Sequence, residues 1–301
     1  MACPLCDDTG WKPIDKDGVR YVVRCDCWKQ SSSQQRLDTA NIPKRYQHCT
    51  IDNFKVYNES LERAVAQARK LVEDFPAVGR GLFLEGQPGV GKTHLAVAVL
   101  RQVMQQSGAR GLFYDTRDLL RVIRGTYNSS THTTELDVLR PVMTADLLVL
   151  DDLGAEKTSE WVEETMNLIV NTRYNERRPT IFTSNYEDIP DDTDPNSLLF
   201  RIGYRMRSRL HEMCDFQVLD GADYRELPEN GGPEDLLMMW KMRGKSLPSP
   251  GRSPQPKTEH GWRDSRARPA DKCRSREGAD RGCARPNEQG RTPAAVAGET
   301  G

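Results

Sequence analysis

The sequence predicts an α/β protein in which helices flank a parallel sheet, with a small N-terminal cysteine module and a disordered C-terminal tail. Three observations lead to this fold class. A glycine-rich loop at 86–93 stands between a strand pattern and a helix pattern. Apolar runs at 147–150 and 179–184 end in polar residues, as buried parallel strands do at a ligand-binding edge. Four cysteines fall in two close pairs near the N-terminus.

The composition limits the classes of protein to which the chain can belong. Its 301 residues leave room for one substantial α/β domain with smaller attachments. A net charge of −1 provides no global basic field, so any DNA-binding surface must be local. The sequence shows neither a long apolar span nor a signal-peptide pattern, so we expect a cytoplasmic protein without a membrane contact. In that compartment the 8 cysteines indicate metal ligands or free thiols before disulfides.

The first module, at 1–30, carries Cys3-x-x-Cys6 and Cys25-x-Cys27, whose four thiolates suit one tetrahedral Zn²⁺. A turn signal and a β-branched strand pattern at 19–24 predict a hairpin between the pairs. So small a module cannot bury an adequate core, so zinc would supply its folding free energy. Four thiolates leave no open coordination position, which favours a structural, partner-holding module. The alternative is a redox pair or unconnected cysteines, because Cys-x-Cys is the less usual spacing.

A polar linker and a first helix follow the cysteines. Residues 31–41 belong to a Ser- and Gln-rich segment that indicates a linker or a marginal helix, and we place the main domain at 42–226. Asn58 is a predicted N-cap. After it, apolar residues recur in helical steps of three and four: Leu61, Val65, Ala68, Leu71, Val72 and Phe75.

The central motif is the phosphate-binding loop Gly86-x-x-x-x-Gly91-Lys92-Thr93, between a strand at 82–84 and a helix at 95–104. Its glycines let backbone N–H groups and the helix N-terminus converge on phosphate oxygens. Lys92 can reach the β- and γ-phosphates, and the Thr93 hydroxyl can bind Mg²⁺. The sequence therefore predicts a nucleoside triphosphate site. The predicted nucleotide-binding residues are Gly86, Gln87, Pro88, Gly89, Val90, Gly91, Lys92, Thr93, His94 and Asp151.

Two carboxylates close a later strand. After a strand pattern at 111–114, a helix pattern at 116–123 and a polar loop at 127–134, the apolar run 147–150 ends in Asp151 and Asp152. Ligands of open α/β sheets bind at the carboxyl ends of strands, so both should face the phosphate loop. We expect Asp151 to hold Mg²⁺ through water, as a Walker B aspartate does, and Asp152 to orient or deprotonate the attacking water.

The next helix and strand bring a candidate amide to the same edge. A helix pattern at 158–177 carries Val162, Met166, Ile169 and Val170 on one side, and the strand at 179–184 then ends at Asn185. From there the Asn185 amide can bridge the γ-phosphate and the attacking water. The alternative is an asparagine that merely closes a turn.

The last part of the domain is rich in arginine. A helix expected at 198–213 would place Arg201 and Arg205 on one face by the i,i+4 rule. Such a run is a solvated face, a phosphate patch, or an arginine presented to a neighbouring subunit's triphosphate. A strand at 216–219 is expected to end the fold.

Two segments follow the domain. The extension at 227–244 shows no clear helical lid, only a helix pattern at 233–242 whose cluster Leu236–Trp240 either packs on the core or meets a partner. Packing is the preferred interpretation. From 245 to 301 the chain is rich in Pro, Gly, Ser and Arg with almost no apolar residues, which predicts a disordered tail.

With these residues in place, the chain resembles the AAA+ ATPases of the DnaC/DnaI helicase-loader family and their IstB-like relatives. The resemblance runs from about Ile42 to Tyr224, and the N-terminal cysteines also resemble the zinc-bearing domain of DnaI-type loaders. Asp-Asp-Leu-Gly-Ala-Glu followed by the Arg-rich helix is more specific to this branch than the phosphate loop. The motifs that carry it are Ile42–Tyr46, Gly86–Thr93, Leu150–Glu156, Thr183–Asn185 and Arg201–Arg207.

The resemblance implies an ATP- and Mg²⁺-dependent ATPase whose catalytic residues are Lys92, Asp152, Asn185 as sensor, and Arg205 as an arginine finger. The finger acts across a subunit boundary, so the chain would self-associate through its ATP sites. Asp152 stands where many AAA+ proteins have Glu, and its shorter side chain implies slow hydrolysis. The resemblance also implies that single-stranded DNA stimulates this hydrolysis. Single-stranded DNA would contact the helix ahead of the Walker B strand through Arg117, Arg121 and Arg124. A solvated helix face is the alternative for these three.

The function implied is loading of the replicative hexameric helicase onto single-stranded DNA. ATP binding would drive assembly and DNA capture, and hydrolysis would release the helicase. Two alternatives stay open: an IstB-like helper that delivers a transposase to its target, and a nucleotide-gated adaptor that binds ATP but barely hydrolyses it. The zinc module favours the loader, because transposition helpers usually carry a different N-terminal segment.

Overall fold

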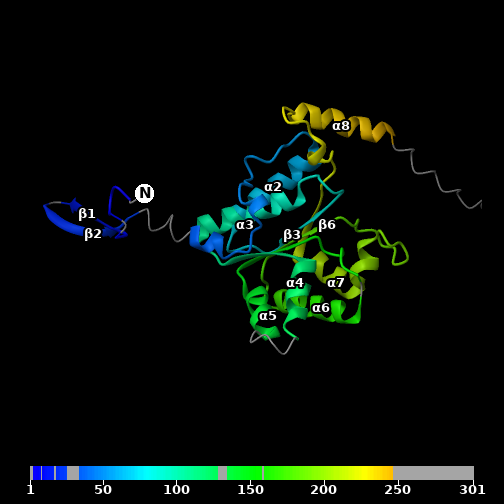
Figure 1. Ribbon diagram of the computed structural model, residues 1–301, viewed down its shortest axis with the longest axis horizontal. Coiled ribbons are helices and arrows are strands. Elements are labelled where there is room, and N and C mark those ends of the chain that lie inside the picture. The colour runs from blue at the N-terminus through cyan, green and yellow to red at the C-terminus, as the bar shows by residue number, and fades with distance from the viewer. Residues whose placement is uncertain are drawn as a thin grey trace, which may run out of the picture. The chain divides into compact units, whose positions relative to one another are not determined.

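The computed structural model describes residues 3–7, 9–16, 18–25, 34–127, 134–157 and 159–246. These residues form an N-terminal hairpin and an α/β body (Figure 1). Several predictions fall on residues outside the described ranges: Cys27, residues 31–33 of the linker, most of the polar loop at 127–134, and the tail from 247 onward.

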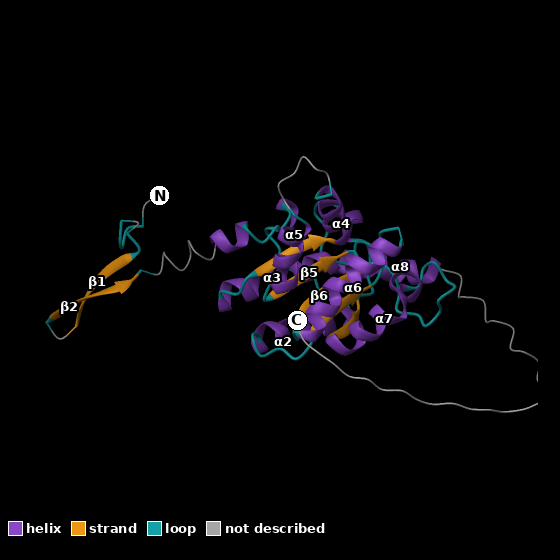
Figure 2. Ribbon diagram, turned by 90° about the horizontal axis from the view of Figure 1, so that it is seen from below, coloured by secondary structure: helices purple, strands orange, loops and turns teal. Residues whose placement is uncertain are grey.

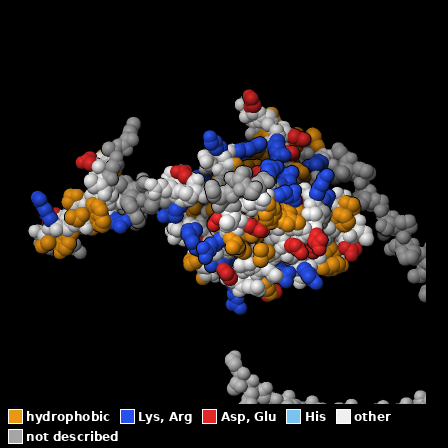
Figure 3. Space-filling model, turned by 60° about the horizontal axis from the view of Figure 1, so that its bottom comes forward, with side chains coloured by type: hydrophobic (Ala, Val, Ile, Leu, Met, Phe, Trp, Pro, Cys, Tyr) orange, Lys and Arg blue, Asp and Glu red, His pale blue; other side chains and the backbone are white. Residues whose placement is uncertain are grey.

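The hairpin consists of β1 (Trp11–Lys16) and β2 (Val19–Arg24), paired antiparallel with Trp11 opposite Arg24. The Cys25 N–H donates to the Gly10 carbonyl at 2.8 Å, which brings Cys25 back to the first turn. The described side chains of both strands are exposed or half-buried, and hydrophobic ones gather on the hairpin surface (Figure 3). The predicted hairpin is therefore confirmed, and it has no apolar core of its own.

The body is built on a five-stranded parallel sheet in the order β4-β5-β6-β3-β7. Every residue of β3, β5 and β6 is buried, which explains why these strands read as continuous apolar runs. Because the strands are parallel, their carboxyl ends meet at one edge. The strands are β3 (Gly81–Glu85), β4 (Gly111–Asp115), β5 (Leu147–Asp151), β6 (Thr180–Ser184) and β7 (Cys214–Val218).

Helices cover both faces of this sheet (Figure 2). Leu82 and Leu84 of β3 belong to a core shared with α2 (Glu59–Asp74) and α3 (Lys92–Ser107). The intervening Phe83 belongs to a second core with the helices of the opposite face. This alternation is the period of two expected of a strand buried on both sides. The opposite helices are α4 (Thr116–Gly125), α5 (Glu135–Thr144), α6 (Glu160–Asn175) and α7 (Leu198–Met213).

Local chemistry accounts for where several helices begin. The Asn58 side chain accepts from the Leu61 N–H at 3.0 Å, so the predicted N-cap of α2 is confirmed. Helix α5 was not predicted, although Thr134 and Asp137 form a capping box at its start. Helix α6 begins two residues later than expected, because Ser159 caps it. The last strand, expected at 216–219, begins at Cys214.

The described chain also contains a helical stretch at 34–38, inside the segment predicted to be a linker or a marginal helix, and the elements η1 (Lys44–Tyr46), η2 (Tyr224–Glu226) and α8 (Pro233–Ser246). Helix α8 extends two residues into the stretch predicted to be disordered. Leu236 is fully buried, as the packing interpretation expected, whereas Met238 is exposed. Among the described helices, none combines the length and the apolar character needed to cross a membrane.

Helix α7 corrects one expectation. Gly203 has φ 75° and ψ 163°, which breaks the helix into two halves. Arg201 and Arg205 stand on either side of this break, so the i,i+4 relation does not hold between them. Arg201 Nε donates to the Pro195 carbonyl at 2.9 Å and its guanidinium lies 4.5 Å from the Tyr186 ring centroid. The break is possible because glycine adopts a positive φ at no Cβ cost.

We predict that Gly203→Ala lowers the free energy of unfolding by about 1–3 kcal/mol, because alanine is strained at this φ and ψ. Gly125 at the end of α4 is the matched control, since a side chain there meets nothing within 4 Å and φ is not positive. Gly125→Ala should change stability by less than about 0.5 kcal/mol. Urea unfolding of both variants checks this. Equal stability of Gly203→Ala and wild type would contradict the assigned kink.

Candidate nucleotide-binding site

A cavity of about 720 Å³ opens at the carboxyl edge of the sheet. A volume of this size suits a small-molecule ligand. The phosphate loop forms one wall, and strand ends β4, β5 and β6 supply the polar groups on another. Residues of the predicted site that line the cavity are Pro88, Gly89, Val90, Gly91, Lys92, Thr93, His94, Asp151, Asp152 and Asn185.

The phosphate loop joins β3 to α3 through glycines with positive φ, among them Gly86 at 145° and Gly91 at 102°. A side chain at Gly91 would meet the Phe54 ring at 2.7 Å, and one at Gly86 would overlap the Leu219 carbonyl oxygen. Glycine is therefore required at both positions by φ and by space. The loop ends at the N-terminus of α3, where backbone N–H groups favour an anion.

Lys92 is buried in the floor of this site, with 6% of its surface exposed. Its ammonium donates to the Gly86 carbonyl at 2.7 Å, to the Gln87 carbonyl at 2.8 Å and to Asn185 Oδ1 at 2.7 Å. Burial lowers the pKa of Lys92 to about 8, against the attraction of Asp152 and Asp151. A phosphate oxygen is an equivalent acceptor that would also supply negative charge, so the residue fits its predicted role.

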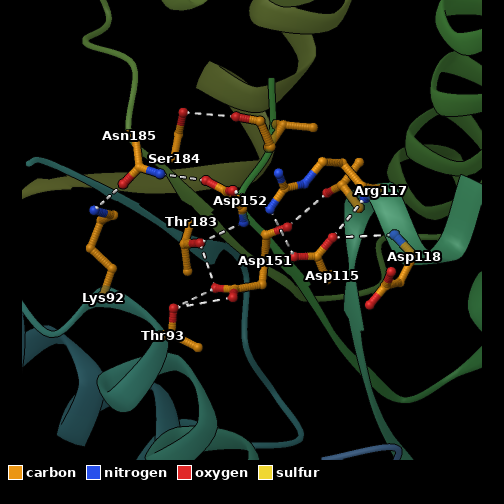
Figure 4. Close-up of polar contacts among 12 residues, drawn as sticks. Lys92, Thr93, Asp115, Arg117, Asp118, Asp151, Asp152, Thr183, Ser184 and Asn185 are labelled. Carbon is orange, nitrogen blue, oxygen red and sulfur yellow. Dashed lines mark hydrogen bonds and ion pairs between the residues drawn. The ribbon is translucent and has the colours of Figure 1, made fainter. Parts of the chain in front are cut away.

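Asp151 joins three segments that lie far apart in the sequence (Figure 4). Thr93 Oγ1 donates to its carboxylate, at 2.9 Å from Oδ1 and 3.1 Å from Oδ2, and Thr183 Oγ1 donates to Oδ1 at 2.7 Å. Burial raises the pKa of Asp151 to about 6, although both hydroxyls lower it. Neighbouring oxygens on an octahedral Mg²⁺ with bonds of about 2.1 Å lie about 3 Å apart. Thr93 and Asp151 therefore fit the predicted magnesium site.

Asp152 and Asn185 meet beside Lys92 (Figure 4). Asn185 Nδ2 donates to Asp152 Oδ1 at 2.5 Å, while its oxygen accepts from Lys92, so one amide bridges a cation and a carboxylate. Burial raises the pKa of Asp152, against the attraction of Arg117 and Lys92. The structure thus brings together three of the four predicted catalytic residues. Arg205 is exposed on α7 and is not among the residues that line this cavity.

The three arginines predicted to contact DNA have different surroundings. Arg117 lies in the cavity wall, with Nη2 3.2 Å from Asp152 Oδ2 and 3.7 Å from Asp115 Oδ2 (Figure 4). Arg121 pairs with Asp118 at 2.7 Å. The Arg124 guanidinium lies 4.7 Å from the Trp161 ring centroid. Their DNA role stays a prediction, but Arg117 is turned toward the predicted water-activating carboxylate.

The sequence analysis did not predict the aromatic part of the cavity wall. The aromatic residues Tyr46, Phe54 and Tyr57 line the cavity, and aromatic rings are groups on which a nucleobase stacks. His94, predicted as a nucleotide contact, has its Nε2 2.8 Å from Asn53 Oδ1 and 3.1 Å from the Thr50 carbonyl oxygen. The aromatic residues between 46 and 57 were the available signal, but only the fold shows that this segment reaches the phosphate loop.

A second candidate site lies at the base of the hairpin. The Sγ atoms of Cys3, Cys6 and Cys25 all lie within 4.8 Å of one another, with 3.8 Å between Cys3 and Cys25. Two thiolates bound at 2.3 Å to one tetrahedral zinc are about 3.8 Å apart. The three cysteines therefore fit the predicted zinc site. The fourth predicted ligand, Cys27, lies outside the described residues.

The parallel sheet, the glycine loop and the Asp151–Asp152–Asn185 edge define an AAA+ type of P-loop nucleotide-binding protein. The family model described as IstB-like ATP binding protein matches residues 6–188. The chain belongs to this family.

Its relatives include helicase loaders. The chain is 30% identical over 158 residues to the replicative helicase loader DnaC of Escherichia coli (strain K12). This match covers 52% of this chain and 64% of that protein. It is 27% identical over 198 residues to the replicative helicase loader DnaI of Bacillus subtilis (strain 168), covering 64% of this chain and 54% of that protein. The matches thus span less than two thirds of either relative.

Solved structures agree with the fold. The crystal structure of the DnaC helicase loader superposes with a TM-score of 0.53 and 36% identity, over 59% of this chain and 99% of that chain. The crystal structure of the DnaI superposes with a TM-score of 0.50 and 23% identity, over 61% of this chain and 94% of that chain, and supports the fold alone. The chain is similar to DnaC/DnaI-type AAA+ helicase loaders, as the motifs indicated.

We predict that Thr183→Val weakens Mg²⁺-dependent ATP binding about tenfold or more, as loss of an outer-shell partner does at a metal site. The Thr183 hydroxyl both donates to Asp151 and accepts from the Asp152 N–H at 2.9 Å, so valine leaves that N–H without this acceptor. Thr183→Ser keeps the hydroxyl and should bind ATP as wild type does. Titration calorimetry with and without Mg²⁺ checks this, and unchanged affinity of Thr183→Val would contradict the assigned site.

Proposed function

We propose that this chain is an ATP-dependent loader of a replicative hexameric helicase. The observation that carries the proposal is the match to DnaC loaders across the ATP-binding core, together with the Lys92–Asn185–Asp152 arrangement within it. The cysteine hairpin is the second support, because it provides a separate surface for a partner.

The proposed chemistry is hydrolysis of ATP at the carboxyl edge. Lys92 and the loop N–H groups bind the phosphates, while Thr93 and Asp151 hold Mg²⁺. Asp152 orients or deprotonates the attacking water, with Asn185 between that water and the γ-phosphate. Asp152 accepts hydrogen bonds from both Asn185 and Arg117, and such bonds to the charged carboxylate make it a weaker base. A weaker base agrees with slow hydrolysis.

We expect single-stranded DNA to stimulate that hydrolysis through α4. Arg117, Arg121 and Arg124 lie on successive turns of this helix, and DNA phosphates attract arginine. Single-stranded DNA that binds Arg117 and breaks its contact with Asp152 would free Oδ2 of that carboxylate. DNA contact and water activation are thereby linked through one side chain.

Self-association is the expected context of Arg205. Arg205 is exposed, as is the adjacent Tyr204, at 63% of its surface. Tyrosine and arginine are both enriched in interface hot spots. A second subunit at this face would receive Arg205 at its own triphosphate, which is the arginine-finger role.

The hairpin is the proposed helicase-binding module. With zinc at the cysteines it would be a rigid unit, yet Trp11, Tyr21 and Val22 remain exposed on its two strands. Side chains alternate between the two faces of a strand, so Tyr21 and Val22 point to opposite sides. A partner in the cytoplasm, rather than a core of its own, would cover them.

The IstB-like family match favours one other function, that of a transposition helper with the same ATPase core. A nucleotide-gated adaptor with little hydrolysis is the third possibility. The transposition helper differs from the loader in its partner, and the adaptor differs from it in ATP turnover. Direct binding to the helicase therefore distinguishes the loader from the transposition helper.

We predict that the full chain co-elutes with the replicative helicase of its own cell in the presence of ATP, measured by size-exclusion chromatography with light scattering. Tyr21→Ala/Val22→Ala should abolish the complex, because it removes apolar contacts from both faces of the hairpin. Leu168→Ala, a change at an exposed residue of α6, should leave it intact. Failure of the wild-type chain to bind would reject the loader function and favour the transposition helper.

A further inference from the structure

Among the described residues outside the nucleotide cavity, Asp188 receives contacts from both an arginine and a histidine of α7. It lies just beyond β6, with 12% of its side chain exposed. Arg207 Nε is 2.5 Å from Oδ1 and Arg207 Nη2 is 3.2 Å from Oδ2, a bidentate pair. His211 Nε2 is 2.8 Å from Oδ2. Arg207 and His211 are four residues apart in the second half of α7, so one carboxylate holds a full turn of helix. We name Asp188, Arg207 and His211 the α7 clamp.

The clamp is anchored to the sheet from two sides. The Asp188 N–H donates to Glu85 Oε2 at 2.9 Å, at the end of β3. The His211 ring stacks on Phe216 of β7, with centroids 4.3 Å apart and planes 6° apart. Phe216 in turn stacks on Phe83 at 4.4 Å. The second half of α7 is thus fixed to strands β3 and β7 through the clamp.

The kink at Gly203 makes this anchoring decisive for Arg205. In an unbroken helix, the first half would fix the direction of the second. Here the first half is held separately, by Arg201 on the Pro195 carbonyl and the Tyr186 ring. Arg205 stands two residues after the kink and two before Arg207. Met206 and Leu210 bury the same half of the helix in the core, so the clamp and this core contact together set the position of Arg205.

The same short segment reaches the nucleotide site. Asn185 bridges Lys92 and Asp152, Tyr186 lies under Arg201, and Asp188 holds the second half of α7. Within the four residues 185–188, one side chain therefore lies at the predicted nucleotide site and two others contact the two halves of the helix. If binding of a phosphate shifted Asn185, the shift would reach α7 through Tyr186 and Asp188, one and three residues further along the chain.

We propose that the α7 clamp positions Arg205, so that Asn185 contacts in one subunit set how that subunit presents its arginine to the neighbour's ATP. The proposal rests on the proposed arginine-finger role of Arg205 and deepens it. Asp188, Arg207 and His211 are positioning residues, since they act through Arg205.

Mixed oligomers of full-length variants test the direction of this effect. Arg205→Ala subunits have an intact ATP site but no finger. Asp152→Asn subunits keep a finger, and the amide oxygen of the new side chain can still accept from Asn185, but they lack the carboxylate proposed to activate water. Mixing the two should restore ATP turnover, because one supplies what the other lacks. Asp152→Asn/Asp188→Asn subunits should restore about 100-fold less, the cost typical of a reacting group displaced by about 1 Å.

The converse mixture separates a finger defect from a defect of the subunit's own site. Asp188→Asn subunits should regain turnover when mixed with Asp152→Asn subunits, and should bind ATP as wild type does. Asp152→Asn/Asp146→Asn is the matched control, because Asp146 pairs with Arg110 at 3.2 Å ahead of β5 and outside the clamp, and it should restore as Asp152→Asn does. Arg207→Lys in the Asp152→Asn chain keeps the charge but loses the bidentate pair, and should restore partially.

Two results would overturn the proposal in distinguishable ways. If Asp152→Asn/Asp188→Asn and Asp152→Asn/Arg207→Lys both restore turnover as fully as Asp152→Asn, the clamp does not position Arg205. If Arg205→Ala alone hydrolyses ATP at the wild-type rate, the finger role itself is wrong, and the clamp proposal falls with it.

Discussion

The Asp151 carboxylate is the interaction on which the rest of the nucleotide site depends. It receives the Thr93 hydroxyl from the start of α3 and the Thr183 hydroxyl from β6, while its own backbone ends β5. Thr183 also accepts from the Asp152 N–H, so the same hydroxyl fixes the next carboxylate. A parallel sheet makes this convergence possible because its strand ends share one edge. Burial destabilises the charged form of this carboxylate and raises the pKa of Asp151, whereas the hydrogen bonds from the Thr183 and Thr93 hydroxyls stabilise the charged form and lower that pKa.

Much of this edge could be predicted from the sequence. The glycine loop needs only local spacing to be recognised, and a strand buried on both faces shows itself as an apolar run. Lys92, Asp152 and Asn185 were placed together because strand ends in open α/β sheets meet. Other features depend on tertiary contacts. The aromatic wall around Phe54 reaches the loop only in the fold. Arg117 was predicted as a DNA contact, with a solvated helix face as the alternative, and neither interpretation included its contacts with Asp115 and Asp152. The break in α7 was signalled by one glycine, which an apparent helical period concealed.

The chain joins two stabilisation strategies. The α/β body has two apolar cores, one on each face of its sheet, and positions polar groups at the edge between them. The hairpin has no such core, and its cysteine spacing fits a metal that would replace one. This contrast explains why partner binding is proposed for the hairpin and chemistry for the body. The kinked α7 then connects the chemistry to a neighbouring subunit, since the loop that carries Asn185 also holds the helix that carries Arg205.

Steady-state ATP turnover by the full chain and by Asp152→Asn, with Mg²⁺ and with or without single-stranded DNA, tests the central claim most directly. The claim is that this carboxyl edge is a hydrolytic site with Asp152 as the residue that activates water. It predicts slow turnover by the wild-type chain, a rise with DNA, and loss of both in Asp152→Asn while ATP binding persists. Equal turnover by the two proteins, unaffected by DNA, would contradict the claim and leave a nucleotide-gated adaptor in its place.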